Sequence, residues 1–129
     1  MDLLYRTFAM AQVTSQEKIY TLQNDLQKVQ INFRSTYQGK TVTQNELTNI
    51  LRFDKDRKHR EEAWLARNQL GREMAPNLTR LIRLRNEEAR KLGYASFYSM
   101  SLEQGEIDET WLFQALEEVD RGSRAPYDK

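Results

Sequence analysis

Cysteine is absent from this sequence of 129 residues, and chain breakers are scarce, with five glycines and two prolines. The absence of cysteine excludes disulfides and thiolate chemistry and fits a reducing compartment, so we expect a cytoplasmic protein. So few glycines and prolines favour long helices over many short strands. A chain of this length is usually one domain with an ordinary core, so residues 1–129 are expected to form a single helical domain.

Long apolar runs and an excess of one charge are missing as well. No stretch approaches the roughly 18 apolar residues of a transmembrane helix, and the start, MDLLYRTFAM, lacks the basic segment and apolar run of a signal peptide. The 20 basic and 19 acidic residues are interleaved, whereas a nucleic-acid-binding domain usually carries a one-sided basic excess. The sequence therefore predicts no membrane segment and no nucleic acid partner.

His59 is the only histidine, which excludes the common hydrolytic and metal sites. No second histidine follows four residues later, so the helical zinc motif H-E-x-x-H is excluded. No serine has a supporting histidine motif, and there is no glycine-rich phosphate loop. We therefore expect no catalytic residue, no metal ligand and no cofactor in this chain, and we expect His59 to be solvated.

Apolar residues at alternating steps of three and four predict a long first helix. Its seam comprises Phe8, Gln12, Ser15, Ile19, Leu22, Leu26, Val29 and Phe33. We expect one helix from about Leu4 to Tyr37. Because so long a helix is unstable alone in water, its seam must pack on other helices.

Two further helices are predicted in the middle of the chain. Thr43 and Glu46 have the spacing of a capping box, which predicts a helix from Gln44 to about Phe53. A long helix then begins near Asp56, which with Asp54 is a candidate N-cap. Its apolar stripe comprises Ala63, Ala66, Leu70, Met74, Leu78, Leu81 and Leu84.

Glycine and proline punctuate the rest of the chain. Pro76, together with Gly71, predicts a kink or a brief break in the long helix, and Gly93 is placed to end it. A short helix is expected over residues 96–102. Asp108 can then cap a last helix, whose expected buried stripe is Trp111 or Leu112, Ala115, Leu116 and Val119. The final RGSRAPYDK contains no element that closes a domain.

The predicted fold is therefore all-α. It has about five helices, with one long amino-terminal helix packed against a kinked long helix and two or three shorter ones.

Arg85 lies on an otherwise apolar or small stripe of the long helix, formed by Leu78, Ile82, Ala89 and Leu92. A guanidinium buried there without a partner would cost several kcal/mol. Three interpretations stay open: the side chain reaches water from the edge of the stripe, it forms a buried ion pair that ties this helix to a neighbour, or it contacts a ligand. Glu88 is the nearest local partner.

Several short motifs follow one another in a defined order. They are Tyr-x-Gly-Lys at 37–40, Arg-x-x-Ala-Trp at 60–64, Gly71 and Pro76, Leu-Arg-Asn-Glu at 84–87, and Ala-Arg-x-x-Gly-Tyr at 89–94. In this order the chain, from Phe33 to about residue 128, resembles the amino-terminal helical region of zinc peptidases of the angiotensin-converting-enzyme and oligoendopeptidase type.

The resemblance implies a mostly helical, two-lobed peptidase with a deep channel for peptide substrates. It also implies zinc held by the two histidines of H-E-x-x-H and a downstream glutamate, which lie beyond this sequence. The chain then looks like a non-catalytic part of the wall or lid of the channel. Its partner would be the remainder of the parent peptidase, and zinc is expected only there. The positions singled out as structural are Trp64, Arg85, Asn86, Glu88 and Tyr94.

Two expectations about surfaces follow. An excised lobe would leave a helix face open, so we expect self-association through the seam of the first helix, at Ile19, Leu22, Leu26, Val29 and Phe33. Trp64 and Trp111 are expected to pack in the core. The alternative function is a free-standing helical module for protein–protein interaction.

Overall fold

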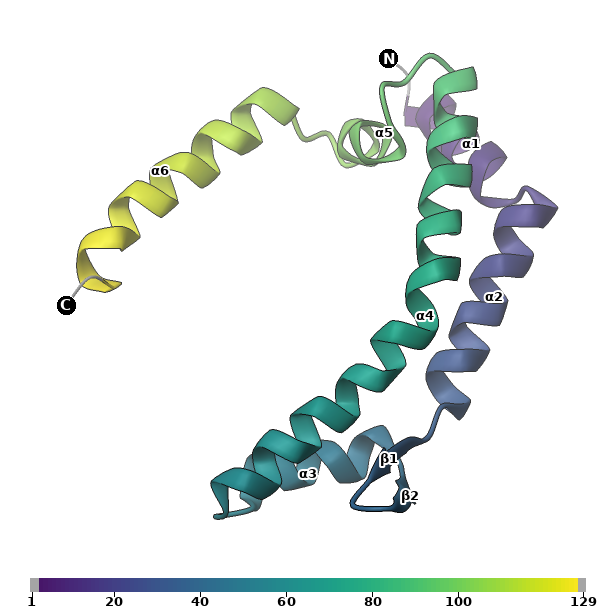
Figure 1. The fold of residues 1–129 in the computed structure, drawn as a ribbon. Helices are drawn as coiled ribbons and strands as arrows, with labels where there is room; N and C mark the ends of the chain where they lie inside the picture. The colour runs from purple at the N-terminus through teal and green to yellow at the C-terminus, as the bar shows by residue number, and fades with distance from the viewer. Residues whose placement is uncertain (1–2, 128–129) are drawn as a thin grey trace. The chain divides into compact units, whose positions relative to one another are not determined.

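The structure is a computed structural model that describes residues 3–127, apart from the side chains of residues 125 and 126 (Figure 1). Its elements in chain order are α1 (Leu3–Thr14), α2 (Glu17–Asn32), β1 (Ser35–Tyr37), β2 (Lys40–Val42), α3 (Gln44–Phe53), α4 (Arg57–Lys91), α5 (Phe97–Gln104) and α6 (Glu109–Tyr127). The all-α fold class is confirmed, with one small hairpin added. None of the helices described is long and apolar enough to cross a membrane.

The chain divides into two compact units. The terminal unit comprises Met1–Ile19 and Ile82–Lys129, and the central unit comprises Tyr20–Leu81. Each unit therefore takes part of α2 and part of α4. The terminal unit also holds α1, α5 and α6, whereas the hairpin and α3 belong to the central unit.

The single helix expected from Leu4 to Tyr37 is wrong, because the chain leaves the helix at Ser15 and Gln16 and again after Asn32. The hydroxyl of Thr14 donates to the carbonyl of Met10 at 2.9 Å, a contact that competes with the helical ladder. The seam also carries polar residues at this point, so packing cannot offset the break.

The expected self-association surface is partly buried within the chain. Ile19 and Leu26, two members of the seam, are 0% and 6% exposed. Leu22, Val29 and Phe33 are half-buried. Self-association through the half-buried residues of the seam stays a prediction.

A tight hairpin replaces the expected end of the first helix. Its strands are antiparallel, with Ser35 opposite Val42, Thr36 opposite Thr41 and Tyr37 opposite Lys40. Gln38 and Gly39 between them both have positive φ, 50° and 75°. This is the backbone of a type I′ turn, which matches the twist of paired strands and favours glycine. The Tyr-x-Gly-Lys motif is therefore the turn of this hairpin.

The central unit has a small core around α3. Leu47 of α3 and Ala63 and Ala66 of α4 are buried there, and the partly buried residues packed on them are Tyr37, Val42, Ile50 and Leu51. The predicted bounds of α3 and its capping box are confirmed. The backbone N–H of Glu46 donates to the Thr43 hydroxyl at 3.2 Å, and the N–H of Thr43 donates to the Glu46 carboxylate at 2.6 Å.

Helix α4 begins after its predicted cap, since Asp56 accepts a hydrogen bond from the backbone N–H of Lys58 at 2.7 Å. It runs for 35 residues with Pro76 inside, so of the kink or brief break expected there the break is wrong. Proline removes one donor from the helical ladder. Pro76 and Arg72, whose carbonyl loses that donor, are both exposed, so water can take the vacant position.

Gly93 ends α4 as predicted, with a φ of 89°. The N–H of Tyr94 donates to the carbonyl of Ala89 at 3.1 Å, which satisfies one of the last carbonyls of the helix. Ser96 then caps α5 by accepting from the N–H of Ser99 at 3.1 Å. Helix α5 lies beside α1, and both contribute buried residues, namely Ala9, Val13, Met100 and Leu102.

The buried stripe expected on α6 is wrong. Trp111 is 61% exposed, Leu116 is 53% exposed and Val119 is 68% exposed. Leu112 and Ala115 are half-buried. The helix begins at the predicted cap, where Asp108 accepts from the N–H of Trp111 at 2.7 Å, but it continues through Gly122 to Tyr127. The amphipathic pattern was recognised correctly, but the neighbour that would cover it is not among the residues described.

Candidate functional site

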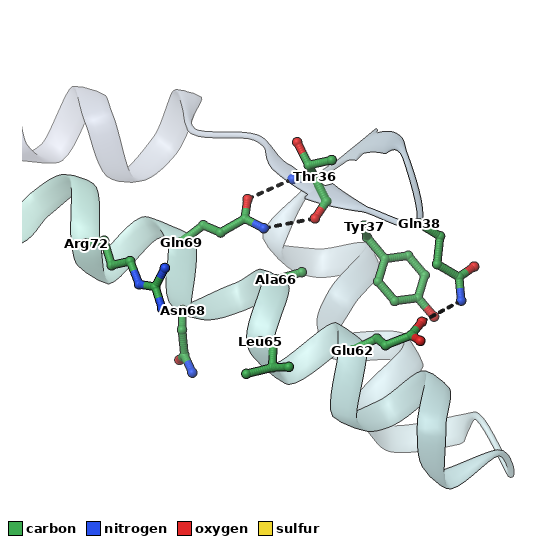
Figure 2. Close-up of a pocket in the computed structure, with 9 residues that line it drawn as sticks. All are labelled: Thr36, Tyr37, Gln38, Glu62, Leu65, Ala66, Asn68, Gln69 and Arg72. Atoms are coloured by element: carbon green, nitrogen blue, oxygen red, sulfur yellow. Dashed lines mark hydrogen bonds between the residues drawn. The ribbon is translucent and has the colours of Figure 1, made fainter.

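The central unit carries an open pocket of about 550 Å³ between the hairpin and α4 (Figure 2). It is lined by Thr36, Tyr37, Gln38, Glu62, Leu65, Ala66, Asn68, Gln69 and Arg72. Most of these side chains are polar, and α4 supplies them at helical spacing. The pocket therefore combines amide, carboxylate and guanidinium groups with apolar surface.

Gln69 closes the free edge of strand β1. Its side-chain oxygen accepts from the N–H of Thr36 at 2.9 Å, and its side-chain nitrogen donates to the carbonyl of Thr36 at 3.0 Å (Figure 2). In an antiparallel pair these two groups of Thr36 point away from the partner strand, because Thr36 faces Thr41 in a non-hydrogen-bonded position. The amide of Gln69 therefore satisfies the edge of β1 as a neighbouring peptide group would.

Two further contacts join the hairpin to α4. The side-chain amide of Gln38 donates to the Glu62 carboxylate at 2.9 Å, and the Tyr37 hydroxyl donates to the carbonyl of His59 at 3.5 Å. Burial raises the pKa of Tyr37, and the carboxylates of Glu62, Asp54 and Asp56 add to the rise. Tyr37 therefore stays a protonated donor at neutral pH.

His59 lies at the corner between α3 and α4. Its Nδ1 is 3.1 Å from a carboxylate oxygen of Asp54, and its side chain is 45% exposed. The backbone N–H of Asp56 lowers the pKa of Asp54 most, and the hydrogen bond with His59 lowers it further. This histidine therefore contacts a local carboxylate, in part contrary to the expectation that it is solvated. Nowhere in the described range do three acidic or histidine side chains form a group suited to a metal.

Arg85 and Asn86 meet α5 in the terminal unit. The guanidinium carbon of Arg85 lies 5.1 Å from the centre of the Phe97 ring, and the side-chain oxygen of Asn86 accepts from the N–H of Phe97 at 2.9 Å. Both residues line a pocket of about 390 Å³ with Ile82, Ser96, Phe97, Tyr98 and Ser101. Arg85 is half-buried, and its guanidinium lies over an aromatic ring, a contact that can accompany any of the three interpretations that the sequence left open.

Glu88 makes the ion pair that ties α4 to another helix. It is 8% exposed and accepts from the ammonium group of Lys18 at 2.5 Å and from that of Lys91 at 3.0 and 3.1 Å. These two hydrogen bonds, from Lys18 first, lower the pKa of Glu88. Lys18 belongs to α2 and lies 70 residues away in the sequence, so helical spacing had no means of revealing it.

The two remaining structural positions differ in their surroundings. Burial raises the pKa of Tyr94, with a further contribution from Glu103, so its hydroxyl is protonated at neutral pH. Trp64 is 56% exposed and Trp111 is 61% exposed, so their expected core packing is wrong within this chain. Arg85, Asn86, Glu88 and Tyr94 lie in the terminal unit, whereas Trp64 lies in the central unit.

The chain was compared with curated proteins, with solved structures and with models of protein families. No curated protein and no solved structure matches the chain. A family model described as angiotensin-converting enzyme matches residues 3–122. The match includes both pockets and extends to α1 and α2, ahead of the segment on which the resemblance rested. The chain therefore belongs to the angiotensin-converting-enzyme family of peptidases.

Proposed function

We propose that this chain is the non-catalytic amino-terminal helical part of a zinc-dependent peptidase, where it forms part of the wall or lid of the substrate channel. The observation that carries the proposal is the family match over residues 3–122. The single histidine of the sequence contacts Asp54 at the α3–α4 corner. Zinc and the residues that cleave the peptide would come from the remainder of the parent peptidase.

Large apolar side chains open to solvent support this proposal. On α1, Leu3, Leu4 and Phe8 are 61%, 60% and 66% exposed. On α4, Trp64 and Leu65 are 56% and 55% exposed. Scattered apolar residues are normal on a surface, but neighbouring exposed residues on one helix mark a place where another element packs. Further helices of the peptidase would cover these faces of α1 and α4.

Hydrolysis and metal content test the proposal on the chain itself. We expect no cleavage of a fluorogenic peptide and no stoichiometric zinc after dialysis against zinc, because tight zinc sites need three or four clustered ligands. Elemental analysis and a hydrolysis assay measure the two quantities. One tightly bound zinc per chain together with hydrolysis would overturn the non-catalytic assignment.

The transcript separates the proposal from its alternative. We expect the reading frame to continue past Lys129 into a segment that encodes H-E-x-x-H, the motif that would hold the zinc. Sequencing of the transcript decides this point. A stop codon next to Lys129 would favour the free-standing interaction module, for which the same exposed faces of α1 and α4 would bind a separate protein.

A further inference from the structure

Helix α5 ends in a Schellman motif, a pair of backbone hydrogen bonds that closes its last turn. The N–H of Ile107 donates to the carbonyl of Leu102 at 2.9 Å, and the N–H of Glu106 donates to the carbonyl of Glu103 at 3.1 Å. The motif places one residue in the left-handed region, and here this residue is Glu106, with a φ of 57°. A residue with a Cβ is strained there, so the strain on Glu106 points to a contact that offsets it.

The end of α4 shows the same motif without this strain. The N–H of Tyr94 donates to the carbonyl of Ala89 at 3.1 Å, and the N–H of Gly93 donates to the carbonyl of Arg90 at 3.0 Å. Gly93 takes the left-handed position with a φ of 89°, which glycine adopts at no steric cost. Because a glycine ends one helix of the terminal unit, the glutamate in the same position at the end of α5 calls for a separate explanation.

Arg6 of α1 makes the contact that offsets the strain. Its Nη1 donates to the carbonyl of Glu103 at 3.1 Å and lies 3.4 Å from the carboxylate of Glu106. The side chain of Arg6 is 17% exposed, so its charge is largely removed from water and gains from a carboxylate nearby. The carbonyl of Glu103 is also an acceptor in the motif itself. Arg6 therefore contacts the last turn of α5 at a backbone group and at the strained residue.

The direction of α6 depends on this turn. Residues 105–108 join α5 to α6, and α6 lies beside α5. Further along α6, Leu116 and Val119 are 53% and 68% exposed, so packing within the chain holds this part of the helix weakly. A helix that is joined through a short turn and packs weakly takes its direction from the φ and ψ angles of the turn.

We propose that residues 105–107 form a hinge of α6, and that Arg6 is the positioning residue that holds the hinge in one state. While Arg6 contacts Glu106, this residue stays left-handed and both hydrogen bonds of the motif are kept. When the contact is lost, the strain favours a negative φ at Glu106, the hydrogen bond from Ile107 to Leu102 opens, and α6 changes direction. The inference concerns the terminal unit alone and does not depend on the proposed function.

The distance between two spin labels tests the motion, since the chain has no cysteine of its own. Labels attached at Arg90→Cys in α4 and Glu117→Cys in α6, both exposed positions, report the direction of α6. Arg6→Gln should broaden the distance distribution about twofold, because a released hinge samples more than one state. Arg124→Gln removes the ion pair with Asp120 within α6 and is the control, which should leave the distribution unchanged. An unchanged distribution in Arg6→Gln would overturn the proposal.

Hydrogen exchange at the N–H of Ile107 tests the role of the strained glutamate. Arg6→Gln should speed this exchange about tenfold, because a charged donor leaves the turn and the motif opens more often. In a chain that carries Glu106→Gly, Arg6→Gln should speed it about threefold or less, because glycine stays left-handed without help. The N–H of Asp54, which donates to the carbonyl of Ile50 at the end of α3, is the control and should exchange at one rate throughout. An equal effect of Arg6→Gln in both chains would contradict the role of Glu106.

Salt tests the same contact in the unchanged chain and stays decisive if Arg6→Gln fails to fold. The side chain of Glu106 is 72% exposed, so high ionic strength screens its carboxylate from Arg6. Exchange at Ile107 should then speed about twofold relative to exchange at Asp54. A ratio of the two rates that does not change with salt would show that the ion pair does not hold the hinge.

Discussion

The α3 corner of the central unit and α6 of the terminal unit are both amphipathic helices, yet only one of them is covered. Leu47 of α3 is completely buried against Ala63 and Ala66 of α4, which follow within 20 residues of it. Leu116 of α6 occupies an equivalent place on its stripe but is 53% exposed. An apolar stripe therefore shows which face needs a neighbour, and it does not show whether that neighbour lies in the same chain.

The polar groups of the two regions also differ in where their hydrogen-bond partners lie. At the corner, the edge of β1 is satisfied by Gln69, and the first turn of α3 by Thr43 and Glu46. On α6 the contacts of Asp108 with Trp111 and of Asp120 with Arg124 are local to the helix. At the corner, the contact of Gln69 with Thr36 therefore joins two elements, whereas these two contacts of α6 join residues a few positions apart.

The largest effect that separates the two regions is expected from leucine-to-alanine substitutions. Leu47→Ala should lower the free energy of unfolding by about 3 kcal/mol, because it leaves a cavity in a core that other elements enclose. Leu116→Ala should cost less than about 1 kcal/mol, because half of its side chain is already in water. Chemical denaturation measures both, and equal losses would contradict the comparison.

A smaller effect, dependent on pH, is expected at Glu88. Lys18 and Lys91 lower the pKa of this carboxyl in the folded chain, so its contribution to stability is present at neutral pH and is lost as the pH falls below the ordinary pKa of a glutamate and through the lowered one. Glu88→Gln should therefore be less stable than the unchanged chain at pH 7, and the two should converge in acid. The lysines are 47% and 66% exposed, which limits the difference.

Denaturation at a series of pH values measures this difference, with Glu87→Gln as the control. Glu87 is the exposed neighbour of Glu88 on the same helix, and its substitution should change stability little at any pH. A gap between Glu88→Gln and the unchanged chain that stays constant down to acid pH would show that the ion pairs with the two lysines are not its cause.

The next effect concerns arginines on one helix. Arg85→Ala should cost about 1.5 kcal/mol, because it removes the packing of the side chain and the guanidinium above the Phe97 ring. Arg83→Ala should stay within about 0.5 kcal/mol, as at an ordinary exposed position. Denaturation of both variants measures the difference, and Arg85→Lys should recover only part of it. Two equal and small losses would make Arg85 an ordinary surface residue.

Local chemistry accounts for what the sequence could predict. The bounds of α3, its capping box, the cap of α4 and the glycine at its end all depend on residues within a few positions of each other. The hairpin was missed because the apolar spacing continued past Asn32 to Phe33, while the turn signal consisted of Gln38 and Gly39 alone.

Contacts distant in sequence account for most of what could not be predicted at the candidate sites. Gln69 meets Thr36 across 33 residues, and Lys18 meets Glu88 across 70. Asn86 was singled out from a motif, but its bond to the Phe97 backbone depends on how the chain turns at Gly93. The exposure of Trp64 and Trp111 could not be predicted either, because aromatic residues on a stripe look the same whether or not a partner covers them.

The smallest effects on stability are expected at Gly71, inside α4, and at Gly93, just past its end, and they have opposite signs. Gly71 lies inside the helix, and a Cβ there would meet nothing within 4 Å, so Gly71→Ala should stabilise the chain by about 0.5 kcal/mol through the lower entropy of the unfolded state. Gly93 has equal space but a φ of 89°, which strains any residue with a Cβ, so Gly93→Ala should destabilise it by about 1 kcal/mol or less. Thermal or chemical unfolding of the two variants measures both signs. A Cβ would have free space at both glycines. A loss of stability in Gly71→Ala would therefore mean that a neighbour covers this face of α4 in solution. The exposed Trp64 and Leu65 on the same helix are the residues that such a neighbour would cover in the assembled peptidase.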